Sequence, residues 1–179
     1  MTRRSWPFLL LAAGYVVVVG ILTLGPTPWR TGPVQTDYDV LSLATWLDPA
    51  TWLRPGDIGS DPIRWARTTG VGEFVGNVLL FLPLGMLLRL ALPRGGWVGA
   101  TLVAASLSFA IEVLQMGTPR VSDPRDLVAN TAGALLGAVI VAAIASIRRR
   151  ATRRSAERRA AAPPTSRDPV PQDLTRAVG

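Results

Sequence analysis

The sequence predicts an all-α membrane protein with four transmembrane helices and both termini in the cytoplasm. Hydrophobic residues occupy 49% of the 179 positions, charged residues occupy only 17%, and the mean hydropathy is positive. Four apolar segments are each long enough to cross a bilayer, and the arginines gather at one end of these segments. These features are typical of a small integral membrane protein rather than of a water-soluble domain.

The four predicted spans contain 18 to 21 residues each, which gives about 27 to 32 Å of helix and matches the hydrocarbon thickness of a bilayer. They cover Pro7–Leu24, Phe74–Leu92, Val98–Met116 and Leu127–Ile147. Because Arg3 and Arg4 precede the first span, it could also be a cleaved signal peptide. Its apolar run is longer than a usual signal core and no A-x-A site follows, so we expect a retained anchor over residues 1–24.

The positions of the arginines predict the orientation of the spans. With four spans, one side of the membrane receives Arg3, Arg4, Arg89, Arg94 and the run of arginines from 148 to 154. Short cytoplasmic segments retain arginine, so this side is assigned to the cytoplasm. The opposite side receives residues 25–73 and 117–126, where six Arg are outnumbered by eight Asp or Glu.

The segment between the first two spans, residues 25–73, is predicted to be an extracytoplasmic loop. It contains Trp29, Trp46, Trp52 and Trp65, and tryptophan prefers the headgroup level of a membrane. Leu43, Trp46, Leu47 and Ala50 follow helical spacing, and Asp48-Pro49 is typical of a helix start. One or two short interfacial helices are therefore expected, with a mostly irregular loop anchored by tryptophan as the alternative.

Residues 148–179 are predicted to form a disordered basic cytoplasmic tail. The chain has nineteen arginines and no lysine, and nine of the arginines lie in this segment, which also has four prolines and no aromatic residue. Such a composition cannot build a core. A basic segment directly after a span attracts anionic lipid by about 1 kcal/mol per arginine near the surface, so we expect no nucleic-acid partner.

Composition also limits the chemistry that the chain can perform. The sequence has no His and no Cys, so zinc hydrolase sites, Ser-His triads and thiolate chemistry are excluded. Neither a cofactor nor a metal site is expected. Glu112, Asp123 and Asp126 could offer oxygen ligands to Mg²⁺, but no diagnostic ligand spacing is present.

Chain direction predicts a polar cluster at the outer end of the last three spans. The second span begins there, the third ends there and the fourth begins there. The candidate ligand-binding residues at this level are Asn77, Glu112, Gln115, Arg120, Asp123, Arg125, Asp126 and Asn130. Ser108, Glu112 and Gln115 have i, i+4, i+7 spacing and share one face of the third span, which we expect to point into the bundle.

The same residues carry a resemblance to a known family. In chain order they are Gly76-Asn77-Val78-Leu79-Leu80-Phe81-Leu82-Pro83-Leu84-Gly85, Ile111-Glu112-Val113-Leu114-Gln115, Arg120, Asp123, Asp126-Leu127, Asn130-Thr131 and Gly133 to Gly137. Over residues 74–140 this combination resembles the VanZ-like family; the first span and the long loop fit it only loosely, and the basic tail lies outside it. The resemblance implies a VanZ-like three-helix core over residues 74–147. It also implies a role in the cell envelope, because the family is named after a protein associated with low-level resistance to the glycopeptide teicoplanin.

Several of these residues also have a structural interpretation. Asp123-Pro124-x-Asp126 is typical of a helix start, with a capping side chain and an acidic first turn. Gly133 and Gly137 form a G-x-x-x-G face that permits close helix approach, within the chain or in an oligomer. On the same face, Asn130 could bond across the helix interface. Asn77 could bond a neighbouring span similarly, and Pro83 is expected to kink the second span.

Glu112 is the candidate catalytic residue, because a carboxylate in hydrocarbon is costly and usually faces a bundle interior. It needs a proton, an arginine partner or water access. The structural interpretation is a buried pair with Arg120 or Arg125. In the functional interpretation Glu112 lies in a wet outer-leaflet pocket and Gln115 orients it, while either arginine holds a phosphate bidentately.

These observations favour a non-enzymatic protein of the cell membrane that acts at the outer leaflet. The expected role is cell-envelope physiology or tolerance of teicoplanin-type glycopeptides, through binding of membrane lipids, a lipid-linked cell-wall component or a lipoglycopeptide. An intramembrane hydrolase or transferase acting on a lipid or polyprenyl headgroup is the alternative, with Glu112 as general acid or base. A small transporter or flippase ranks last, because the inner halves of the second and fourth spans offer almost no polar path.

Overall fold

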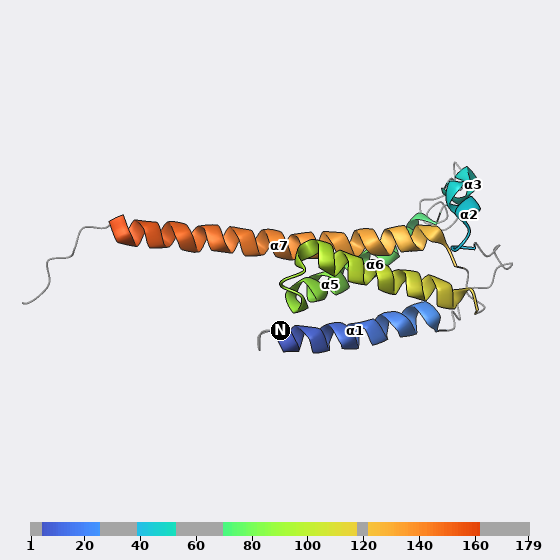
Figure 1. The fold of residues 1–179 in the computed structure, drawn as a ribbon, viewed down its shortest axis with the longest axis horizontal. Helices are drawn as coiled ribbons and strands as arrows, with labels where there is room; N and C mark the ends of the chain where they lie inside the picture. Colours follow the sequence, from blue (N-terminus) through green and yellow to red (C-terminus); the bar gives the residue numbers. More distant parts are fainter. Residues whose placement is uncertain (1–4, 26–38, 53–69, 118–121, 162–179) are drawn as a thin grey trace, which may run out of the picture. The chain divides into compact units, whose positions relative to one another are not determined.

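The computed structural model describes residues 5–25, 39–52, 70–117 and 122–161, and within these ranges the only regular elements are helices. Four of them are long and apolar enough to cross a membrane, which confirms the predicted all-α class with four spans. They are α1 (Trp6–Leu24), α5 (Val71–Ala91), α6 (Gly96–Gln115) and α7 (Pro124–Ala161) (Figure 1). Each of these helices overlaps the span predicted for it, and all ends except the C-terminal end of α7 lie within three residues of the prediction.

Local sequence explains most of the helix ends. A proline lies in the first turn of α1, where its missing N–H is not needed. Gly70 precedes α5 with a φ of 72°, a left-handed conformation that glycine adopts at little cost. The short turn from α5 to α6 contains Pro93 and Gly95, so the two helices must run in opposite directions.

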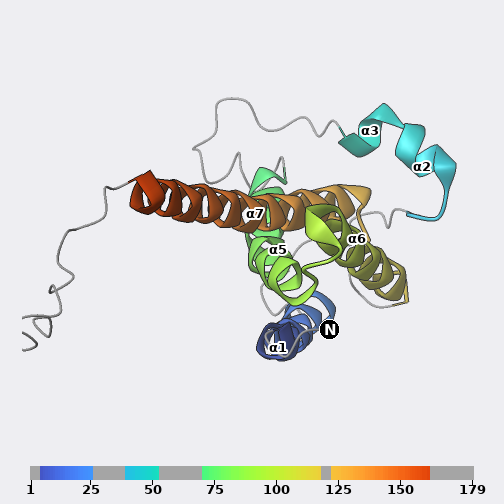
Figure 2. The ribbon, with the colours of Figure 1, turned by 60° about the vertical axis from the view of Figure 1, so that its left-hand side comes forward.

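The described spans pack around α5. Contacts join α1 to α5, α5 to α6 and α1 to α6, and Figure 2 shows α5 between α1 and the first part of α7. The buried apolar cluster draws on all four spans. Its members are Ala12, Val19, Phe81, Leu84, Leu88, Ala100, Ala104, Ile111, Ala134 and Ala138. Many large apolar side chains outside this cluster remain exposed, as expected for helices that face lipid.

The contact between α5 and α7 brings backbone against backbone. A Cβ atom added at Gly133 would collide with the carbonyl oxygen of Val78, and one added at Gly137 would collide with the carbonyl oxygen of Leu82. From the other side, a Cβ at Gly85 would collide with the carbonyl oxygen of Ala134. The predicted G-x-x-x-G packing is therefore present within the chain, and α5 occupies the glycine face that was also considered for an oligomer.

The proline inside α5 is supported by a neighbouring helix. Pro83 has no N–H, so it cannot bond the carbonyl four residues earlier, and its ring disturbs the preceding turn. In that turn the Leu80 carbonyl accepts a hydrogen bond of 2.9 Å from the Tyr15 hydroxyl of α1. The Tyr15 hydroxyl therefore provides a hydrogen bond to a backbone carbonyl near the proline and links the first two spans.

The predicted short helices of the outer loop are present as α2 (Leu43–Leu47) and α3 (Pro49–Trp52). The indole N–H of Trp46 donates to the Val40 carbonyl at 2.9 Å, and that of Trp52 donates to the Trp46 carbonyl at 3.1 Å. The two indole rings have their centroids 5.9 Å apart. Trp29 and Trp65 lie outside the described residues.

The last helix does not end where the apolar span ends. Helix α7 continues to Ala161, so the prediction of disorder is wrong for residues 148–161. Alanine, arginine and glutamate are strong helix formers, and a helix that continues from a span needs no new nucleation step. Arg153 and Glu157 also form an i, i+4 ion pair with an N–O distance of 2.9 Å. The chain divides into two compact units, residues 1–144 and 145–179, and residues 162–179 lie outside the described part.

Candidate functional site

The Glu112 side chain lies at the centre of a buried polar cluster near the end of α6. Only 1% of this residue is exposed. Its Oε2 atom accepts a 3.1 Å hydrogen bond from the Ser122 hydroxyl and a 3.0 Å hydrogen bond from the Asp123 backbone N–H. No ion pair involves Glu112 among the described residues, so the Glu112–Arg125 pair is not formed, and the pair with Arg120 lies outside them. The carboxylate is bonded to the start of α7 and closed off from solvent, in contrast to the expected wet pocket.

Asp123 connects this carboxylate to the first turn of α7. Its side-chain Oδ1 accepts a hydrogen bond of 2.9 Å from the Arg125 N–H, which is the geometry of an N-cap. Pro124 follows as the first residue of the helix. The structure therefore confirms the predicted helix start. It adds that the backbone N–H of the capping residue itself is bonded by Glu112.

A second pair of side chains joins α6 to α7 one turn deeper. The Asn130 amide donates from Nδ2 to the Ser108 hydroxyl oxygen over 2.9 Å, and both residues are buried. The predicted bond of Asn130 across a helix interface is present, with Ser108 as its partner. The Oδ1 atom of Asn130 is buried and has no hydrogen-bond partner among the described residues.

Gln115 links the cluster to the first span. Its Nε2 atom donates a 2.8 Å hydrogen bond to the Thr23 backbone carbonyl in the last turn of α1, where carbonyl groups lack a partner within the helix. The Thr23 hydroxyl donates in turn to the Val19 carbonyl at 2.7 Å. This bond places the ends of α1 and α6 at the same end of the bundle, together with the starts of α5 and α7. We call it the outer end, following the arginine distribution.

Ser108, Glu112 and Gln115 are all buried, so the predicted inward-facing side of α6 is confirmed. With Ser122, Asp123 and Asn130 they form what we call the outer polar cluster. Sequence reasoning did not identify Ser122 or Thr23 as partners. Ser122 immediately precedes a helix-capping Asp and faces a buried acid, but only the tertiary fold shows that its hydroxyl reaches Glu112.

The remaining residues predicted for the site are not members of the outer polar cluster. Arg125 is partly buried, and a Cβ atom added at Gly70 would lie 3.2 Å from its Nη1 atom, so the guanidinium group touches the start of α5. Asp126 is partly buried in the first turn of α7. Asn77 is half-buried and makes no hydrogen bond to another described residue, so it does not join the cluster. Arg120 lies outside the described residues.

The acidic side chains of the site do not form a metal centre in the described ranges. No group of three or more Asp, Glu, His or Cys side chains is arranged to hold a metal ion there. The carboxylate of Glu112 accepts hydrogen bonds from protein donors, and that of Asp123 caps a helix. These contacts fix the position of α7 relative to α6.

The comparison with known proteins agrees with the residues described above. The VanZ/LLP1 family profile matches residues 11–145, which is more than two thirds of the 179-residue chain. This match is longer than the predicted resemblance over residues 74–140, because it also includes most of α1 and the outer loop. No curated protein and no solved structure matches the chain. The chain belongs to the VanZ/LLP1 family of proteins, and its four long apolar helices make it a membrane protein.

Proposed function

We propose that this protein is a non-enzymatic accessory protein of the cell membrane that binds the anionic headgroup of a lipid-linked or amphiphilic envelope component at the outer leaflet. The observation that carries the proposal is the contact between Arg125 and Gly70. It places a guanidinium group beside the N-terminus of α5. No side-chain hydrogen bond caps this helix start, and its first turn carries Glu73. The first N–H groups of a helix lack partners within it and lie at the positive end of its dipole.

A phosphate group suits this arrangement. Backbone N–H groups at a helix start bind phosphate oxygens, and arginine adds parallel N–H donors that match a phosphate in geometry. Hydrogen bonds of the outer polar cluster hold the turn that carries Arg125. Glu112 holds the Asp123 N–H, and Asp123 caps the turn that carries Arg125. The position of Arg125 therefore depends on bonds in the bundle interior.

The hydrolase or transferase alternative is less well supported by the geometry. A general acid or base must lie within hydrogen-bond reach of the group that it protonates or deprotonates. Glu112 is 1% exposed, and one of its oxygens already accepts two hydrogen bonds from the chain. Those contacts support a positioning role for Glu112 in the binding of a headgroup.

The proposal is tested by binding of a polyprenyl phosphate to the full-length protein in nanodiscs, with the uncharged polyprenol as the comparison ligand. Arg125→Gln should weaken phosphate binding by about tenfold or more, the usual loss for a hydrogen bond to a charged group. It should leave polyprenol binding unchanged. Arg153→Gln is the matched control, because Arg153 lies in the second unit and pairs with Glu157. Equal phosphate binding by the wild type and Arg125→Gln would rule the proposal out.

The physiological part of the proposal needs a separate measurement. A susceptible bacterial host that expresses the wild-type protein should tolerate a higher teicoplanin concentration than the same host with Arg125→Gln at matched membrane levels. We expect Glu112→Gln to retain part of this protection, because glutamine keeps an acceptor oxygen for Ser122 and Asp123. Complete loss with Glu112→Gln, at normal protein levels and normal phosphate binding, would favour a chemical role for the carboxylate instead.

A further inference from the structure

Arg89 lies in the last turn of α5, at the end of the bundle opposite the outer polar cluster. It follows Gly85 by four residues, so it leaves the helix from the side that meets α7. Its Nε atom is buried and has no hydrogen-bond partner among the described residues. A buried polar atom of an arginine without an acceptor is costly, which makes this position conspicuous.

The described spans of the first unit offer no carboxylate at this end of the bundle. There is no Asp or Glu in residues 1–24, 74–111 or 127–147. The acidic residues of the described spans in the first unit, Glu73, Glu112 and Asp126, all lie at the outer end. The positive charge of Arg89 therefore has no counterion within the described spans of that unit.

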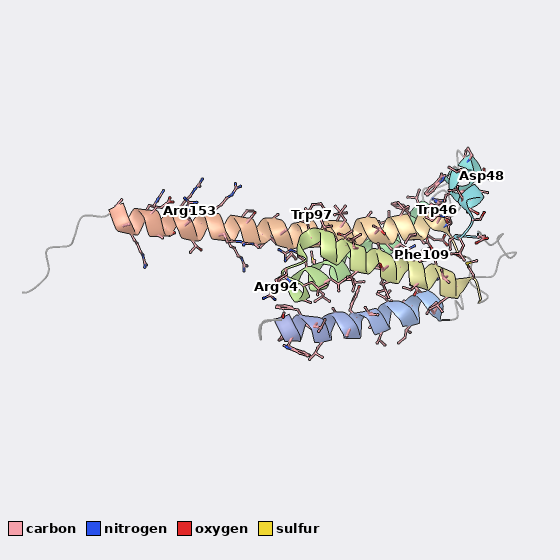
Figure 3. All side chains as sticks on the ribbon, viewed as in Figure 1. Trp46, Asp48, Arg94, Trp97, Phe109 and Arg153 are labelled. Atoms are coloured by element: carbon pink, nitrogen blue, oxygen red, sulfur yellow. The ribbon has the colours of Figure 1, made fainter. Side chains whose placement is uncertain are left out.

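The depth of Arg89 in the bilayer indicates the kind of counterion that can reach it. Arg89 follows Val71 by 18 positions, which is about 27 Å along the helix and close to the full hydrocarbon thickness. Trp6 and Trp97 begin α1 and α6 at the same end and are largely exposed, as tryptophans at the headgroup level are. Arg94, in the turn after α5, is exposed there as well (Figure 3). This level of the membrane contains the phosphates of lipid headgroups.

We propose that Arg89, assisted by Arg94, binds the phosphate of an anionic phospholipid in the inner leaflet. The site lies at the opposite end of the bundle from the proposed outer headgroup site, and it does not depend on that proposal. A bound lipid phosphate supplies a negative charge, which the described spans of the first unit lack at the inner end. An arginine at this level can pack its aliphatic carbons against apolar surface and extend the end of its guanidinium group toward the headgroups.

The site can be tested by counting lipids that remain on the purified full-length protein. Native mass spectrometry would compare phosphatidylglycerol, phosphatidylcholine and inorganic phosphate added to protein in detergent micelles. The wild type should retain phosphatidylglycerol in preference to phosphatidylcholine. Arg89→Gln should weaken that retention by about tenfold, the loss expected for one charge-assisted hydrogen bond. Arg89→Lys keeps the charge but not the bidentate geometry, so its retention of phosphatidylglycerol should lie between that of the wild type and that of Arg89→Gln.

Controls separate this site from the rest of the molecule. Arg153→Gln should bind phosphatidylglycerol as the wild type does, and the Arg89 and Arg94 variants keep the basic α7 extension unchanged. If Arg89→Gln is not recovered folded, Arg89→Lys and the surface variant Arg94→Gln decide the question, since each should still reduce retention. Unchanged retention in all folded variants would overturn the proposal. Displacement of the lipid by millimolar inorganic phosphate would also overturn it, in favour of a soluble-anion site.

Discussion

Replacing Gly133 with alanine tests whether the close approach of α5 and α7 stabilises the fold. The added Cβ atom would meet the Val78 carbonyl oxygen, its carbon and its Cα. All three are backbone atoms, so no flexible side chain can move aside. The two helices must separate, and the core side chains that pack at their contact must separate with them.

The magnitude follows from comparing this substitution with the same change at a glycine that faces open space. Gly14 in α1 is such a position, because a Cβ there would meet nothing within 4 Å. Both alanine variants gain about 1 kcal/mol of helix propensity, which cancels in the comparison. Only Gly133→Ala has the overpacking cost of about 1 to 3 kcal/mol. The difference in unfolding free energy between the two variants should therefore be about 1 to 3 kcal/mol.

The assay is reversible unfolding of the purified full-length protein in mixed micelles, with far-UV circular dichroism as the signal and denaturing detergent as the perturbant. Gly14→Ala should unfold at the same or a higher detergent fraction than the wild type, and Gly133→Ala at a lower one. If the two variants have the same unfolding free energy, the backbone contact between α5 and α7 does not stabilise the protein and the reasoning fails.

Two further predictions concern single hydrogen bonds and use the same unfolding measurement. Tyr15→Phe removes the bond to the Leu80 carbonyl next to Pro83 and should lower the unfolding free energy by about 1 kcal/mol; no change would mean that the proline turn is satisfied without Tyr15. Glu112→Ala leaves the Ser122 hydroxyl and the Asp123 N–H without their acceptor, so it should destabilise the fold by at least 1 to 3 kcal/mol more than Glu112→Gln does. Equal stability of the two Glu112 variants would contradict the bonding described for that carboxylate.

Much of the fold could be predicted because lipid imposes simple rules on sequence. A span needs about twenty apolar residues, so the four helices could be located, with every end except that of α7 within a few residues. The inward face of α6 followed from the spacing of Ser108, Glu112 and Gln115, because polar side chains in a membrane turn toward the protein. Helical spacing and the Asp48-Pro49 pair predicted α2 and α3 in the same way.

The remaining features depend on information that local sequence does not carry. Hydropathy marks where a helix leaves the membrane and not where it ends, so the extension of α7 to Ala161 was missed. Chain direction placed Asn77 at the correct end of the bundle, but its side chain is only partly buried and makes no hydrogen bond to the outer polar cluster. The bonds from Ser122 to Glu112 and from Tyr15 to Leu80 join residues on different elements, and only the packed structure brings them together.

The glycine contact between α5 and α7 also limits how the bundle can rearrange. Val78 faces Gly133 and Leu82 faces Gly137, so the two helices run in the same direction and meet at intervals of four residues. Sliding one along the other by one residue would push larger side chains into a space that admits only glycine. A slide of four residues, about 6 Å along the axis, would keep only one glycine of the pair at the contact and bring Ala129 or Val141 against the α5 backbone. Helix α5 and the part of α7 in the first unit should therefore move as one rigid body. Conformational change would be confined to the borders of α1 with α5 and α6, where the single hydrogen bonds of Tyr15 and Gln115 can break and re-form.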